Sequence, residues 1–367
     1  MESVYSKKED CSGCAACRDL CPTGAIAMLP DAERFAYPRI DRESCIDCGL
    51  CASVCPLIKE GHYKSADASA FFAARHKSDE VLKSSTSGGA FTALSDAVLA
   101  VGGTVYGADF DEAFRVLHRR AETPAQRDRM RFSKYVQSGM DGIYAQMRDD
   151  LRAGRSVLFT GTPCQTAGMR ARFRTPQETG NLFLCDVICH SVPSPRVWED
   201  YKRLLAEEAG APLVHVQFRS KEYAWSRENS NKGFLYGVEG EEKMREDDRF
   251  HDLFIRDNRI VRPSCHACRF TDAKRASDIT IADYWGIEAF APELYDPLGV
   301  SLVMVNTPQG RRLFEMAGTA MEIRERPPRE ALSQQKRLSR PGKLPMDREA
   351  FWDDYERNGL AAVLKRL

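Results

Sequence analysis

From residue 70 onward, short apolar runs alternate along the chain with longer amphipathic stretches. Short apolar runs bounded by glycine or proline are typical of buried strands, and apolar positions three and four apart are typical of helices. The pattern predicts strands at residues 70–74, 103–110, 156–160 and 182–189, and helices at residues 89–100, 141–153, 164–173 and 196–208. A further strand is expected between Asp278 and Asp283.

Strands that alternate with helices favour an α/β fold with a largely parallel sheet. Residues 214–237 depart from that pattern, because alternating residues and glycines there indicate an antiparallel excursion. We therefore expect the α/β class with α+β elements, built on a mixed sheet.

Length, composition and charge limit the size of the fold and the kinds of partner that the chain can bind. The chain has 367 residues, 43% of them hydrophobic, which is enough for one large domain and a small module. Lys and Arg number 53, as do Asp and Glu, so the charge balance gives no sign of a nucleic-acid or anionic-membrane partner. No segment has the apolar length of a membrane span, and the charged first ten residues lead into no signal-peptide core, so we expect a cytoplasmic location.

Cysteine usage points to metal. The chain has 13 cysteines, too many for incidental core thiols, and a reducing compartment disfavours disulfides. The first eight form the run C-x2-C-x2-C-x3-C-P twice, with cysteines at positions Cys11, Cys14, Cys17, Cys21, Cys45, Cys48, Cys51 and Cys55.

In such a repeat, the fourth cysteine of each copy binds the cluster held by the other copy. We therefore assign Cys11, Cys14, Cys17 and Cys55 to one [4Fe-4S] cluster, and Cys45, Cys48, Cys51 and Cys21 to another. A pair of zinc sites is the alternative, but zinc modules separate two C-x2-C pairs by a longer loop. Residues 5–58 resemble a bacterial two-cluster ferredoxin.

The remaining cysteines are Cys164, Cys185, Cys189, Cys265 and Cys268. Two lie at predicted strand ends and two form a C-x2-C pair, so Cys164, Cys189, Cys265 and Cys268 could converge on a third [4Fe-4S] cluster. Cys185 lies inside an apolar run and is expected to be a packed core thiol. Half of a zinc knuckle, with His190 or His266 contributing, is the alternative for Cys265 and Cys268.

A series of motifs in one order carries a family resemblance. The motifs lie at residues 85–91, 134–138, 158–165, 189–194, 262–268 and 277–286. Together they resemble the coenzyme F420 hydrogenase/dehydrogenase beta-subunit family, whose related branches include the plant 7-hydroxymethyl chlorophyll a reductases. Ser191 and Ala282 depart from the family pattern, since glycine is expected at both positions.

The resemblance implies a non-covalent FAD beside a [4Fe-4S] cluster, with Cys164, Cys189, Cys265 and Cys268 as ligands and hydride exchange between flavin and substrate. It makes a set of polar and glycine residues flavin-binding candidates: Ser87, Gly88, Gly89, Lys134, Gln137, Ser138, Thr160, Gly161, Thr162 and Asp278. It also makes His190 and Asp283 catalytic candidates.

Several of these candidates have a plainer alternative. Ser87 to Gly89 can be an ordinary helix start, and Lys134 a solvated lysine. Asp278 and Asp283 can simply cap a strand, and His190 can hydrogen-bond its own loop.

These features predict four parts: a two-cluster ferredoxin-like domain (1–60), a linker (61–69), a FAD/[4Fe-4S] oxidoreductase domain (70–305) and a C-terminal extension (306–367). Residues 322–345 are rich in Arg, Lys and Pro. Such a run is usually a solvated irregular segment, and the alternative is a docking surface for an acidic redox partner such as ferredoxin. Asp347 is expected to cap a final helix that Gly359 closes.

Three functions remain open at this point. The first is oxidation or reduction of coenzyme F420, and the second is ferredoxin-dependent reduction of another organic metabolite. The third is a non-catalytic subunit that relays electrons in a larger redox complex. No G-x-G-x-x-G follows a predicted strand, so the chain shows no nicotinamide fingerprint.

Overall fold

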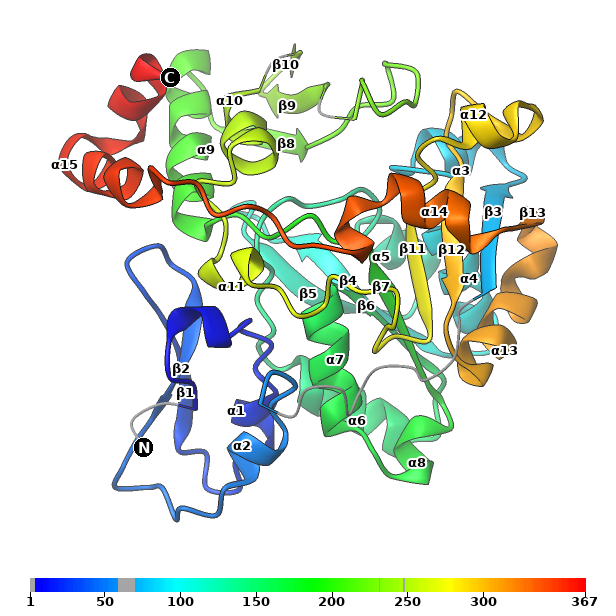
Figure 1. Cartoon of the computed structure of the whole chain (residues 1–367), viewed down its shortest axis with the longest axis horizontal. Coiled ribbons are helices and arrows are strands. Elements are labelled where there is room, and N and C mark those ends of the chain that lie inside the picture. Colours follow the sequence, from blue (N-terminus) through cyan, green and yellow to red (C-terminus); the bar gives the residue numbers. More distant parts are fainter. Residues whose placement is uncertain (1–3, 59–69, 231, 247) are drawn as a thin grey trace.

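The computed structural model describes residues 4–58, 70–230, 232–246 and 248–367 (Figure 1). It has the expected mixed α/β class, with a small N-terminal unit beside a large mixed sheet. The predicted linker at residues 61–69 lies outside the described residues. No helix in the described parts of the chain has the length and apolarity needed to cross a membrane.

The N-terminal unit, drawn in blue in Figure 1, consists of one hairpin and short helices. Strands β1 (Ile26–Pro30) and β2 (Ala36–Ile40) pair antiparallel. The helices are η1 (Lys8–Asp10), α1 (Ala16–Leu20) and α2 (Leu50–Ser53). The two cysteine runs share a backbone shape, because Gly13 and Ala15 in the first have positive φ, as do Asp47 and Gly49 at the matching positions of the second.

The large sheet has the strand order β13-β3-β12-β11-β7-β6-β4-β5. Its strands are β3 (Ala70–His76), β4 (Thr104–Phe110), β5 (Val116–Ala121), β6 (Val157–Gly161), β7 (Leu182–Val187), β11 (Ile279–Asp283), β12 (Ser301–Val305) and β13 (Met321–Arg326). Only the four central strands, β4, β6, β7 and β11, run parallel. The sheet is therefore mixed, as expected: its centre is parallel, and its outer strands pair antiparallel.

Helices cover both faces of this sheet. Leu182 and Leu184 of β7 pack on the face covered by α6 (Ile143–Arg152) and α7 (Pro163–Arg172). Phe183 and Cys185 pack on the opposite face with α4 (Ala90–Leu99) and α13 (Pro308–Ala317). This alternation follows from the two-residue repeat of a strand buried on both sides.

A second, antiparallel sheet fulfils the expectation for residues 214–237. It has the order β10-β9-β8, formed by β8 (Leu213–Gln217), β9 (Phe234–Val238) and β10 (Glu241–Arg245). Its core includes Trp198 of α9 (Pro195–Ala209) and Tyr355 of α15 (Arg348–Arg366). The backbone of Gly359 is non-helical inside α15, so the final helix breaks where expected but then continues.

The segment expected to be irregular, residues 322–345, is largely regular instead. It contributes β13, α14 (Pro328–Gln334) and η5 (Lys336–Leu338). β13 pairs with β3, so the large sheet draws on residues beyond position 305. Pairing with the sheet edge explains the difference, because the apolar Met321 and Ile323 alternate with polar residues along β13.

Short elements complete the fold. They are α3 (Asp79–Lys83), α5 (Pro124–Asp128), α8 (Pro176–Thr179), α10 (Arg249–His251), the π-helical turn η2 (Asp252–Arg256), α11 (Pro263–His266), α12 (Ile287–Phe290), η3 (Pro292–Leu294) and η4 (Gly318–Ala320). Helix α11 packs against η1 of the N-terminal unit and so lies at the contact between the unit and the rest of the chain (Figure 1).

Candidate functional site

The structure brings together the four thiols assigned to the first cluster. Cys11, Cys14, Cys17 and Cys55 line one pocket, together with apolar residues of the N-terminal unit. We call these four residues the inner cysteine group. The third cysteine of the first run lies near the fourth cysteine of the second run, as the repeat predicts.

The electrostatics of the inner group suit a cationic iron core. Burial raises the pKa of the Cys17 thiol to about 12, and the neighbouring Cys11 and Cys55 act in the same direction. Burial, Cys55 and Cys17 likewise raise the pKa of Cys14. Thiolates crowded in this way need a compensating cation, and iron-sulfur clusters are held by four cysteine thiolates.

The second predicted group, Cys21, Cys45, Cys48 and Cys51, lies farther toward solvent, and we call it the outer cysteine group. Cys48 is exposed, and Ile46 near it is 65% exposed. Burial raises the pKa of Cys51, and Cys48 and Cys45 contribute in the same direction. Cys51 also acts on Cys17, so the outer group adjoins the inner one.

The four remaining ligand candidates also converge. Cys164 lies in the first turn of α7 directly after β6, and Cys189 follows β7, so both stand at the carboxyl edge of the central parallel strands. Cys265 belongs to α11, and Cys268 follows it. We call these four residues the domain cysteine group.

Mutual effects on pKa show the proximity of these thiols. Burial raises the pKa of Cys189, and Cys265, Cys164 and Cys268 raise it further. Burial raises the pKa of Cys265 to about 12, with Cys268 as the next cause, and that of Cys268 to about 11, with Cys164 as the next cause. The donor set is the one that a [4Fe-4S] cluster uses.

The histidines proposed for a zinc knuckle have other contacts. Nδ1 of His266 lies 3.1 Å from the Lys343 carbonyl oxygen. The His190 ring packs edge-on against Phe254, and its Nε2 lies 3.3 Å from Arg337. Among the described residues, no three His, Cys, Asp or Glu side chains form a site for a single metal ion.

Cys185 lies apart from all three groups. It is 1% exposed and packs with the core on the α4 and α13 face of the sheet. Its position agrees with the expectation of a packed core thiol.

The candidate residues at the start of α4 lie against strand β12. A Cβ on Gly88 would approach the Ser301 backbone nitrogen to 2.5 Å, so only glycine fits there. Gly89 has φ +79 and precedes the helix. The Ser87 hydroxyl donates to the Val300 carbonyl at 2.9 Å.

The candidates between residues 134 and 138 are engaged by the protein. The Lys134 amine donates to the carbonyls of Arg129 and Arg131, both at 2.7 Å, and burial lowers its pKa to about 7. Gln137 donates to the Ser12 carbonyl of the N-terminal unit at 3.1 Å. The Ser138 hydroxyl accepts from Gln165 at 3.0 Å.

The turn that carries Cys164 is tightly held. The Thr160 hydroxyl donates to the Tyr106 carbonyl at 3.0 Å, and a Cβ on Gly161 would lie 2.9 Å from the Phe159 ring. Thr162 forms a capping box with Gln165, and its hydroxyl lies 3.2 Å from the Cys164 sulfur. The turn therefore fixes the direction of the thiol.

The two aspartates that flank β11 have different surroundings. The carboxylate of Asp278 is buried and accepts from Arg170 at 2.6 Å and from the Leu184 backbone N–H at 2.8 Å. Asp283 accepts from Arg219 at 2.9 Å and from the Trp225 indole N–H at 2.6 Å. Asp278 thus ties β11 to β7 and α7. Asp283 instead contacts a separate group of polar and aromatic side chains.

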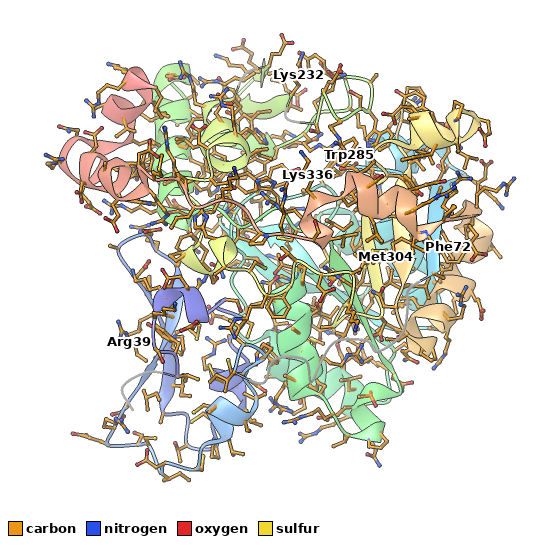
Figure 2. The ribbon with its side chains drawn as sticks, in the orientation of Figure 1. Arg39, Phe72, Lys232, Trp285, Met304 and Lys336 are labelled. Carbon is orange, nitrogen blue, oxygen red and sulfur yellow. The ribbon has the colours of Figure 1, made fainter. Side chains whose placement is uncertain are left out.

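The sequence alone did not predict this group of polar and aromatic side chains beside Asp283. Thr86, Arg219, Lys221, Tyr223 and Trp225 line one small pocket. Trp225 stacks on Trp285, which Figure 2 labels, with ring centroids 5.1 Å apart. The residues after β8 carried no recognisable spacing, and only the tertiary fold brings them to Asp283.

Lys221 is a cation of this pocket whose hydrogen-bond partners are backbone carbonyls. Its amine donates to the backbone carbonyls of Ser87, at 3.3 Å, and of Leu298. No carboxylate forms an ion pair with it in the described parts of the chain. Burial lowers its pKa to about 8, against the opposing effect of Asp283.

Comparisons with known proteins agree with this layout. Residues 154–331 match the family described as the C-terminal part of the coenzyme F420 hydrogenase/dehydrogenase beta subunit. Residues 10–57 match a 4Fe-4S dicluster domain. No curated protein matches the chain.

Thirteen chains of solved structures match this chain, and one of them illustrates the likeness in fold. It is a chain of the xenon-derivatised F420-reducing [NiFe] hydrogenase complex from Methanosarcina barkeri, with a TM-score of 0.50 and 17% identity, covering 82% of this chain and 96% of that chain. At that identity the likeness concerns the fold alone.

Proposed function

Because the chain belongs to the coenzyme F420 hydrogenase/dehydrogenase beta-subunit family through residues 154–331 and carries a 4Fe-4S dicluster domain at residues 10–57, we propose that it is an iron-sulfur flavoenzyme. The proposed activity is electron exchange between three [4Fe-4S] clusters, FAD and an organic substrate that gives or takes a hydride. Coenzyme F420 is the first candidate substrate.

One observation carries the proposal: the three cysteine groups follow one another through the molecule. The outer group, with exposed Cys48, adjoins the inner group through Cys51 and Cys17. Arg262 contacts Cys11 of the inner group and lies three positions before Cys265 of the domain group. Such a succession from solvent to the carboxyl edge of a sheet suits entry or exit of single electrons at the outer group.

When bound, the clusters carry single electrons, and FAD converts between single electrons and a hydride. The chain's own residues supply cationic and aromatic contacts for such a cofactor or substrate. Lys221 offers a positive charge without a carboxylate ion-pair partner among the described residues, which suits a phosphate or carboxylate group. Trp225 and Trp285 offer aromatic faces, and Asp283 fixes the Trp225 indole by accepting its N–H.

A second candidate function is a reductase of another organic metabolite that takes electrons from ferredoxin. The exposed Cys48 of the outer group and the exposed Ile46 beside it favour a protein donor that docks there. A non-catalytic relay subunit would share the cysteine groups but needs no flavin.

The test is anaerobic purification with iron, sulfide and flavin measured per chain, followed by addition of reduced coenzyme F420. We expect about twelve irons, from three four-iron clusters, and one flavin that bleaches with reduced F420. A flavin that is reduced only through ferredoxin would support the second candidate, and clusters without flavin would support a relay. Zinc in place of iron would overturn the proposal.

Two cysteine variants test the ligand assignment in the same measurement. Cys189→Ser should lose about a third of the iron, because one of three clusters loses a ligand. Cys185→Ser is the matched control from the preceding strand β7 and should keep all the iron, since Cys185 packs in the core. Loss of iron in Cys185→Ser with none in Cys189→Ser would refute the domain cysteine group.

A further inference from the structure

Arg262 is a fully buried cation at the contact between the N-terminal unit and the large domain. It is 1% exposed. Its guanidinium donates to the carbonyl oxygens of Cys11 at 2.9 Å and Ala36 at 3.1 Å, and to the side-chain oxygen of Gln137 at 2.8 Å. Nη2 also lies 3.8 Å from the Cys11 sulfur.

None of these partners is a carboxylate. In the described parts of the chain, Arg262 takes part in no ion pair with Asp or Glu. Burial of a charge without a counter-charge is strongly unfavourable. The guanidinium instead lies beside the Cys11 thiol of the inner cysteine group. Four thiolates around an iron-sulfur core leave a net negative charge.

The main chain of the same residue reaches the domain cysteine group. The Arg262 carbonyl accepts from the backbone N–H of Cys265 at 2.9 Å, and Pro263 then begins α11. One residue therefore touches a ligand candidate on each side, through its side chain and through its backbone.

The guanidinium is held in a single position. It lies over the Tyr37 ring, with its central carbon 4.1 Å from the ring centroid. A Cβ on Gly13 would lie 2.9 Å from Nη1, so glycine leaves the room that the side chain occupies. A cation fixed by an aromatic face and three acceptors stays close to Cys11.

From this arrangement we infer that Arg262 is a positioning residue that favours the reduced state of the inner cluster and fixes that cluster against the domain cysteine group. This inference rests on the proposed function. Reduction adds one electron to a cluster that is already negative, and no proton or bond needs to move. A positive charge and hydrogen bonds near the ligand sulfurs raise the reduction potential of a cluster.

The experiment is an anaerobic potentiometric titration of the whole protein, followed by electron paramagnetic resonance of the reduced clusters. The inner-cluster signal is identified as the one that Cys14→Ser changes. In Arg262→Gln we expect this signal to titrate at a more negative potential, by about 59 mV for each tenfold loss in the reduction equilibrium constant. The outer-cluster signal should stay where it is.

Arg348→Gln is the matched control. Arg348 also joins the two units, through a forked contact with Glu33, and it donates to the Val261 carbonyl next to Arg262, but no cysteine sulfur is among its contacts. Its loss should loosen the contact between the units without moving the inner-cluster potential. An unchanged potential in Arg262→Gln, or the same shift in both variants, would overturn the inference.

If Arg262→Gln assembles no clusters, Arg262→Lys replaces it. The lysine keeps the charge but cannot satisfy Cys11, Ala36 and Gln137 together, so a smaller shift in the same direction is expected. A shift of the inner-cluster potential to a more positive value in that variant would also overturn the inference. Wild-type protein without clusters would instead refute the proposed function and leave no potential to compare.

Discussion

At the scale of single residues, burial decides what a polar side chain does near the site. His118 of β5 is buried, its ring stacks on Phe159 with centroids 5.1 Å apart, and its Nε2 lies 2.9 Å from the Thr160 carbonyl oxygen. Burial lowers the pKa of His118 to about 4. A neutral imidazole that donates to Thr160 thus supports the strand end from which the Cys164 turn begins.

This shift predicts a pH dependence of stability. The folded pKa lies below the ordinary value of about 6.5, so the unfolded chain binds the proton first as pH falls. The contribution of His118 is complete above pH 6.5 and is lost as pH falls toward 4, by about 2 kcal/mol at pH 5. We expect His118→Gln, which keeps a donor for Thr160 but does not titrate, to lose less stability between pH 7 and pH 5 than the wild type.

Thermal unfolding midpoints at the two pH values measure this difference. Because His118→Gln also changes core packing, the comparison concerns the change with pH within each protein. Equal changes in the two proteins would show that His118 does not titrate in this range.

At the scale of elements, the two cysteine runs of the N-terminal unit have the same backbone shape but different neighbours. Gly13 and Asp47 hold matching positions, with φ of +73 and +50. A side chain is therefore tolerated at this position where the run faces solvent. At Gly13 the space is taken by Arg262 and Gln137.

Gly13→Ala should consequently disturb the contact between the units. A residue in the left-handed region costs about 1–2 kcal/mol, and overpacking adds about 1–3 kcal/mol. Gly24→Ala is the control, because Gly24 has φ +71 with nothing within 4 Å of the added Cβ, so it carries the backbone cost alone. Hydrogen exchange of residues 134–138 should increase in Gly13→Ala and stay at the wild-type level in Gly24→Ala; equal exchange in both would contradict the packing argument.

At the scale of the whole molecule, ion pairs join the N-terminal unit to the large domain. Asp19 of α1 accepts from Arg148 of α6 and Arg172 of α7, both at 2.6 Å, and its side chain is 12% exposed. Arg18 pairs with Asp141, whose side chain is 81% exposed. Loss of the Asp19 charge leaves Arg148 and Arg172 without this partner at a largely buried contact. Loss of the Asp141 charge matters less, because water can solvate Arg18 at that exposed contact.

We therefore expect Asp19→Asn to weaken docking of the unit by about 1–3 kcal/mol, and Asp141→Asn by less than about 1 kcal/mol. Hydrogen exchange of α1 and α7 in the intact protein reports docking, and iron content reports whether the clusters remain. Faster hydrogen exchange of α1 and α7 in Asp141→Asn than in Asp19→Asn would refute the expectation that Asp19 contributes more to docking.

The sequence by itself determined what depends on local spacing. The repeated cysteine run predicted the 4Fe-4S dicluster domain, and period-two and helical patterns located β3, β4, β6, β7, α4, α6, α7 and α9. These signals are local because the spacing of apolar residues within a strand or helix reflects which of its faces is buried. The motif order likewise identified the family that residues 154–331 match.

Only the tertiary structure decided which distant residues meet. β5, β12 and β13 join the sheet through antiparallel pairing, and local spacing does not encode which strands they pair with. Lys221 and Trp225 reach Asp283 only through the loop after β8, and Arg262 reaches Cys11 across 251 positions of sequence. Contacts over such separations depend on how whole elements pack, so no single stretch of the chain contains them.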